Sequence, residues 1–236
     1  MDTAKQFSLE KRHSVKILHI TNALLSVRMQ TPSDLVYLEL GVPSAESMIT
    51  QRQRDFIAKL QRSPSYDTSP LKYAADLAVR LNSPMGKHLK MLYNTLQDPV
   101  SSFLVSLETR VRTATTTRNT VYLSINPDLT PHSMYSSSIP VPEMYRIAMS
   151  RLRLSSHYLR IETGRWSRIP REERLCQCQE DIQTEQHVLL NCPRTLHIRQ
   201  QFPAVPTGSI NELMNFKPET VLCKFVFCVM KFATNM

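Results

Sequence analysis

Glycine is scarce in this chain: four of its 236 residues are glycine, whereas fifteen are proline. Rossmann folds and P-loops need glycine-rich turns where the backbone approaches a phosphate. The shortage of glycine therefore argues against both kinds of nucleotide site. Prolines between apolar stretches favour many short elements with sharp starts, because proline is well tolerated at the first position of a helix.

Long apolar runs are lacking as well. The longest, "VLCKFVFCVM" at 221–230, is interrupted by Lys224, and a membrane-spanning helix needs about 20 apolar residues. The N-terminus, "MDTAKQFSLEKRH", has no apolar core of the kind found in signal peptides. We therefore expect an intracellular protein, of the nucleus or cytoplasm, with no membrane partner. In such reducing compartments, clustered cysteines more often bind metal than form disulfides.

Helical periodicity is what the chain has in quantity. Helices are predicted over 14–29 and 44–62 from apolar residues at near-helical spacing. Three later helices are predicted to begin where a capping side chain precedes a proline: at Ser69-Pro70, Ser83-Pro84 and Asp98-Pro99. The apolar stripes that follow these starts are predicted to be core: Leu71, Ala74, Ala75, Ala78 and Leu81; Met85, Leu89, Leu92 and Leu96; Val100, Phe103, Leu104, Leu107 and Val111.

The predicted fold is mainly α: a helical bundle, then a small C-terminal zinc-binding module and a terminal amphipathic helix. A stretch rich in Ser, Thr and Pro separates the two parts, and we expect it to hold at most a short strand at 121–125. The expected segments are a flexible N-terminus (1–13), a helical region (14–112), the connection (113–141), a helix with the zinc module (142–200), and a link with the C-terminal helix (201–236).

The metal candidate is the pattern Cys176-x-Cys178-x8-His187-x4-Cys192. Zinc takes four sulfur or nitrogen ligands in a tetrahedron, and four protein ligands leave no open position for water. The spacing therefore predicts a structural zinc ion rather than a catalytic one. Two alternatives stay open: His197 could replace His187, and the cysteines could simply fill a core. Two further cysteines, in the apolar C-terminal helix, are interpreted as packing residues: Cys223 and Cys228.

Positive charge is concentrated just before this pattern. The chain carries a formal charge of +9, and residues 146–174, the arginine-rich segment, hold eight arginines against three glutamates. Arginines bind phosphates, and aromatic rings stack on unpaired bases. The alternative is a solvated helix face with Trp166 packed beside the metal site. The candidate nucleic-acid-binding residues are Arg151, Arg153, Arg160, Arg165, Trp166, Arg168, Arg171 and Arg174.

The stretch "LRLSSHYLRIETGRWSRIPREERLCQCQEDIQTEQHVLLNC" resembles the C-terminal region of non-LTR (LINE-type) retrotransposon polyproteins. In those proteins a segment of the form "SSH-L-IE-GR" is followed by "PREER-C-C" and "TE-HVL--C". The resemblance covers roughly 14–232 and is specific at 151–192. It implies that Cys176, Cys178, His187 and Cys192 bind zinc, and that the chain handles RNA or DNA beside a reverse transcriptase polypeptide.

No catalytic set is apparent in the sequence. A reverse transcriptase needs paired aspartates, commonly as Tyr-x-Asp-Asp, but the nearest match is "YAAD" at 73–76, with one aspartate. Two-metal chemistry requires more carboxylates than that. We therefore expect a non-catalytic, nucleic-acid-binding remnant of such a polyprotein, without a small-molecule substrate. The alternatives are a protein-interaction scaffold or inactive relic that docks on a polymerase, and an enzyme that uses Cys–His chemistry.

Overall fold

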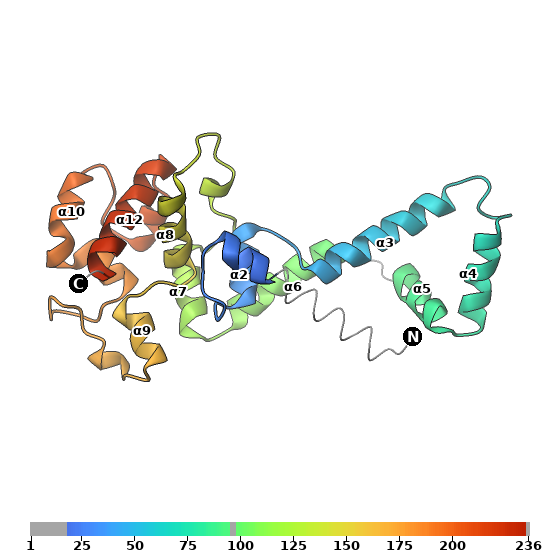
Figure 1. Ribbon diagram of the computed structural model, residues 1–236, viewed down its shortest axis with the longest axis horizontal. Coiled ribbons are helices and arrows are strands. Elements are labelled where there is room, and N and C mark those ends of the chain that lie inside the picture. The colour runs from blue at the N-terminus through green and yellow to red at the C-terminus, as the bar shows by residue number, and fades with distance from the viewer. Residues whose placement is uncertain (1–17, 95–97, 235–236) are drawn as a thin grey trace. The chain divides into compact units, whose positions relative to one another are not determined.

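The computed structural model describes residues 18–94 and 98–234, and within them it is mainly helical, which confirms the predicted fold class (Figure 1). No strand occurs in these two ranges; the sole β feature there is an isolated bridge between Leu175 and Ile182. The chain divides into two compact units. A smaller unit is formed by Val42–Thr109, and a larger unit by Leu18–Gly41 together with Arg110–Met236. The predicted flexible stretch 1–13 and residues 14–17 of the first predicted helix lie outside the described residues.

The smaller unit is built from helices whose starts follow the predicted capping logic. It contains α3 (Ala45–Gln61), α4 (Pro70–Arg80), α5 (Pro84–Asn94) and the first part of α6 (Pro99–Thr113). All three proline entries are capped as predicted, because Ser69 Oγ, Ser83 Oγ and Asp98 Oδ2 accept hydrogen bonds from backbone amides three residues later. The helix predicted over 44–62 is also confirmed as α3.

The apolar stripes of these helices are only partly core. Leu71, Leu81 and Met85 are 61%, 70% and 62% exposed, and no residue of α4 is buried. In contrast, Leu107 and Val111 near the end of α6 are fully buried. The prediction that all three stripes are core was therefore wrong for α4 and the start of α5. Leu96 of the second stripe lies outside the described residues. Periodicity predicts an apolar helix face, but that face becomes core only where a second element covers it.

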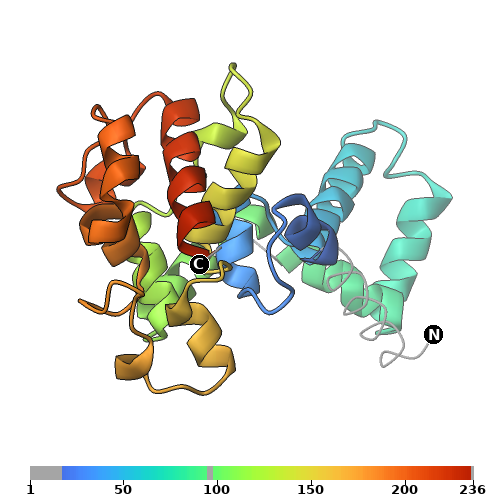
Figure 2. The same ribbon diagram turned by 60° about the vertical axis from the view of Figure 1, so that its left-hand side comes forward.

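The larger unit is organised around its last helix. Leu222, Phe225 and Val226 of α12 (Glu219–Thr234) are fully buried. The helix lies against α8 (Glu143–Arg153), and the two run side by side in both views (Figures 1 and 2). Cys223 is buried in this core and Cys228 packs against it, as predicted. The remaining elements are α2 (Ser33–Leu40), α7 (Thr117–Ile125), η1 (Ser133–Tyr135), α9 (Arg160–Trp166), η2 (Arg171–Glu173), η3 (His187–Asn191), η4 (Pro193–Thr195), α10 (Leu196–Gln201) and α11 (Ile210–Met214).

A helix stands where the sequence predicted a loop with at most a short strand. Within the stretch 113–141, Thr116 caps α7 by accepting a hydrogen bond from the Asn119 amide. Tyr122 and Ile125 of α7 are buried in the larger unit. Tertiary burial of these side chains outweighs the low helix propensity of the threonines around them. Among the described residues no helix is both long and apolar enough to cross a bilayer.

Candidate metal centre and nucleic-acid interface

A tight turn presents the first two cysteines. The Cys176 amide donates to the Asp181 carbonyl (2.7 Å), and the Gln179 amide donates back to the Cys176 carbonyl (2.9 Å). Gln179 takes a left-handed conformation, with φ of +64°, which reverses the chain. The isolated bridge from Leu175 to Ile182 closes the base of this turn. Cys176 and Cys178 therefore point from one loop toward a common place.

A single π-helical turn presents the other two ligands. Element η3 begins at His187, whose amide donates to Thr184 Oγ1 (3.1 Å). The Cys192 amide donates to the His187 carbonyl (2.7 Å), which is the i to i+5 bond of a π-helix. This bond brings residues five apart to the same side of the turn. Element η3 ends at Asn191, and η4 begins at Pro193, directly after Cys192.

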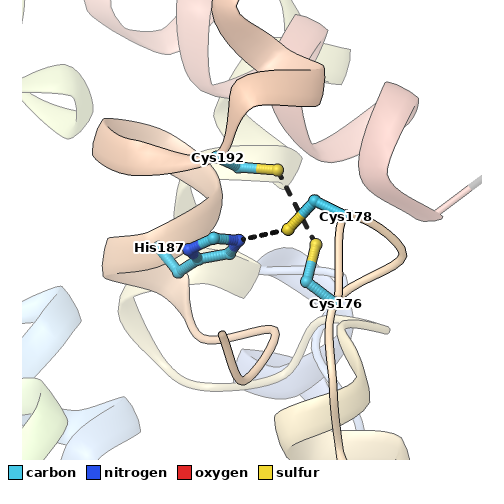
Figure 3. Close-up of side chains that lie close together, drawn as sticks. All are labelled: Cys176, Cys178, His187 and Cys192. Carbon is cyan, nitrogen blue, oxygen red and sulfur yellow. Dashed lines mark hydrogen bonds between the residues drawn. The ribbon is translucent and has the colours of Figure 1, made fainter. Parts of the chain in front are cut away.

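The four side chains converge (Figure 3). Their ligand atoms, from Cys176, Cys178, His187 and Cys192, all lie within 4.8 Å of one another. The sulfurs of Cys176 and Cys192 are 3.7 Å apart, and Cys178 Sγ lies 3.2 Å from His187 Nε2. No two of these cysteines form a disulfide. The cluster, named the Cys3His cluster below, could hold a metal ion.

His197 is not part of the Cys3His cluster. Its ring packs edge-on against Phe232 of α12, with ring centroids 4.8 Å apart. The set of mutually close ligand atoms contains His187 and not His197. The choice that spacing left open is therefore decided by geometry in favour of His187.

The surroundings of the cluster shift the pKa values of Cys176 and Cys178 in opposite directions. Burial raises the pKa of the Cys176 thiol to about 12. Burial also acts to raise the pKa of Cys178, but the backbone amides of Glu180 and Asp181, together with the other two thiols, hydrogen-bond to its sulfur and bring its pKa below the ordinary value. Burial lowers the pKa of His187, although the carboxylate of Asp181 opposes this, and that carboxylate lies 3.7 Å from Nδ1. The His187 ring turns Nδ1 toward a carboxylate and Nε2 toward sulfur, an orientation that is common for metal-ligating histidines.

Arg199 of α10 hydrogen-bonds to the backbone of the cluster residue Cys192. Arg199 donates to the Cys192 carbonyl (2.9 Å) and to Thr195 Oγ1 (2.7 Å). Thr195 Oγ1 in turn donates to the Val188 carbonyl (2.8 Å). These bonds tie the end of η3 to α10 and fix the backbone that carries Cys192. The guanidinium also places positive charge beside a cluster whose three thiolates would outweigh a divalent ion.

Hydrogen bonds join the cysteine turn to the arginine-rich segment. The Gln183 amide donates to the Arg174 carbonyl (2.9 Å), and Gln183 Oε1 accepts from the Arg160 amide (2.8 Å) at the start of α9. The Arg160 guanidinium donates to the Leu175 carbonyl (3.0 Å), next to Cys176. The order of this turn therefore bears directly on the position of α9.

One predicted nucleic-acid contact is wrong. Arg153 is 3% exposed, and its Nε donates to Glu39 Oε1 at 2.7 Å; Glu39 itself is completely buried. The hydroxyls of Tyr122 and Tyr135 also donate to Glu39. Arg153 cannot reach a phosphate from this position, because its charge neutralises a buried carboxylate.

The other predicted arginines differ in how free their guanidinium groups are. Arg174 is half-buried and donates to the carbonyls of Ile161 and Ile169, so it braces α9. Gly164 is needed there, because a Cβ atom would lie 2.7 Å from the Arg174 side chain. Arg151 donates to the Ser26 carbonyl (2.7 Å). The exposed arginines of the set are Arg160, Arg168 and Arg171, while Arg165 is half-buried.

The sequence did not predict several residues that contact the side chains of α9. Glu162 is buried and accepts hydrogen bonds from Arg118 (3.0 Å), and Arg165 makes an ion pair with it (3.1 Å). The guanidinium carbon of Arg28 lies 3.7 Å from the centre of the Trp166 ring system. No local pattern could have indicated these partners, because Arg28 and Arg118 are far from α9 along the chain. Trp166 thus packs on Arg28.

Comparison with protein-family models, with curated proteins and with solved structures found no match.

Proposed function

We propose that the Cys3His cluster holds a structural zinc ion. Two thiolates bound to a tetrahedral ion at about 2.3 Å would lie about 3.8 Å apart, which agrees with the 3.7 Å between Cys176 and Cys192. Four protein ligands complete the shell, so the ion would bind no substrate. It would link the cysteine turn to η3 and stabilise a stretch that has few apolar residues.

The function that this arrangement supports best is non-catalytic binding of RNA or DNA. The main observation in its favour is that hydrogen bonds connect the Cys3His cluster to α9. The exposed Arg168 and Arg171 lie directly after α9 in the chain. A rigid segment loses less conformational entropy when its arginines engage phosphates. The resemblance to retrotransposon polyproteins agrees with this role, and it implies a reverse transcriptase polypeptide as a further partner and the nucleus or cytoplasm as the location.

A salt series tests this function. Binding of a labelled oligonucleotide should weaken with salt, with a slope of log K against log[salt] of about −0.7 to −0.9 per phosphate neutralised. Replacement of Arg168 and Arg171 by glutamine should reduce that slope by about 1.4 to 1.8. Arg80→Gln on α4 is the matched control and should leave the slope unchanged, because Arg80 is an exposed arginine of the smaller unit. No binding at low salt, or a flat salt response, would refute the proposal.

A second candidate is a protein-interaction scaffold, favoured by exposed apolar side chains. In the larger unit Ile20 and Leu24 are 58% and 67% exposed, and in the smaller unit Phe56 is 62% exposed. Large exposed apolar patches mark interaction sites in soluble proteins. Light scattering tests this candidate: self-association that Phe56→Ser abolishes would support it, and a monomer at high concentration that also binds oligonucleotides would count against it.

A further inference from the structure

Two aromatic side chains stand exposed beside α9 although each is large enough to be core. Trp166 ends α9 and is 43% exposed, and Tyr158 precedes it and is 53% exposed. Their rings meet edge to face, with centroids 5.9 Å apart and an angle of 86°. Exposing this much ring surface costs free energy that burial would have gained. The pair, named the aromatic pair below, is therefore a candidate contact for a ligand.

The aromatic pair is held in place by Arg28. The Arg28 amide donates to Ser156 Oγ (2.8 Å), and Nη2 donates to the Ser155 carbonyl (3.0 Å). These bonds pin the guanidinium over Trp166 at 3.7 Å. A cation on an indole ring is a favourable contact in itself, and it limits the rotation of Trp166. The ring is therefore positioned before any ligand arrives.

Positive charge exceeds negative charge near the aromatic pair. Arg28, Arg118 and Arg165 all lie within 3.7 Å of a single buried carboxylate, that of Glu162. A second carboxylate, that of Glu185, also interacts with Arg165, so the three guanidinium groups exceed the two carboxylates by one positive charge. The exposed Arg168 follows Trp166 by two residues and adds to it. Fixed rings beside arginines are the two components of sites for single-stranded nucleic acid, where bases stack and the backbone meets positive charge.

We infer that the aromatic pair stacks on an unpaired nucleobase, so that the protein prefers single-stranded nucleic acid to duplex. This inference rests on the proposed function and adds the form of nucleic acid and the residues that select it. In a duplex both faces of a base are covered by its neighbours, so the ring surface of Tyr158 and Trp166 has nothing to stack on. In a single strand a base can leave its neighbours and stack on one of the two rings, which stand at 86° to each other.

Trp166 provides a direct readout, because it is the only tryptophan of the chain. The full chain is titrated with three labelled probes: a short thymidine oligonucleotide, an abasic strand with the same number of phosphates, and a duplex of the same length. We expect the thymidine strand to quench Trp166 emission and to bind about tenfold tighter than the abasic strand. Tyr158→Ala should remove that difference, whereas Tyr158→Phe, which keeps a ring, should retain it.

The outcomes separate this inference from the proposed function. Equal affinity for the thymidine and abasic strands, with unchanged Trp166 emission, would overturn stacking while phosphate binding stands. A duplex that binds as tightly as the thymidine strand would also overturn it. Failure of all three probes to bind would overturn both proposals. Because Tyr158 is more than half exposed, Tyr158→Ala should fold, and an unchanged thermal melt verifies this.

Discussion

The buried ion pair between Glu39 and Arg153 gives a sharp test of how the larger unit is held together. Arg153→Met removes the guanidinium that lies 2.7 Å from Glu39 and leaves a completely buried carboxylate facing the hydroxyls of Tyr122 and Tyr135. Removal of one partner of a buried pair costs about 3–5 kcal/mol. Domains of this size have only about 5–15 kcal/mol of stability. We therefore expect a large fall in the free energy of unfolding.

Urea unfolding followed by Trp166 fluorescence measures this loss, since Trp166 belongs to the larger unit. The control is the double variant Glu39→Gln with Arg153→Met, which removes the buried charge together with its partner. Because replacement of both charges of a buried pair is often nearly neutral, the double variant should recover most of the lost stability. If Arg153→Met unfolds like the parent but binds oligonucleotides weakly, then Arg153 is a phosphate contact after all.

Two further predictions concern the smaller unit and the pH response. Gly86→Ala should open the α4–α5 pair, because a Cβ atom would collide with the Ala78 carbonyl; we expect a loss of about 1–3 kcal/mol in thermal unfolding, and none for the exposed neighbour Lys87→Ala. Burial, together with the positive charges of Arg153 and Lys217, lowers the pKa of His132 from 6.5 to about 4. Between these values the unfolded chain binds a proton that the folded chain does not, so stability should fall by up to about 3 kcal/mol as pH drops from 7 to 4. Urea midpoints across that range should fall less for His132→Gln, and parallel curves for the two proteins would contradict the assignment.

Local features of the sequence predicted local features of the structure. The capping side chains before three prolines start helices as expected, because a cap and its amide lie three residues apart. The spacing of the Cys3His cluster also predicted its members, since the cysteine turn and η3 are each formed within a few residues. The choice between His187 and His197 needed the structure.

Contacts between distant residues were not predictable in the same way. Arg153 looks like its neighbours in the arginine-rich segment, but its partner Glu39 is 114 residues away. Arg28 lies over the Trp166 ring, although the two residues are far apart along the chain. The helix α7 forms because Tyr122 is buried in the larger unit, which a threonine-rich sequence does not reveal. These three features share one cause. Whether a side chain is buried or paired depends on contacting residues that are far away in the sequence.

Metal content of the purified protein tests the central claim most directly, namely that the Cys3His cluster holds an ion that orders α9. We expect about one zinc ion per chain in the parent and in His197→Ala. Cys192→Ser and His187→Ala should lose the ion, and their Trp166 emission should shift as the parent's does on chelation. A parent that carries no metal, or Cys192→Ser and His187→Ala variants that keep it in full, would contradict the claim.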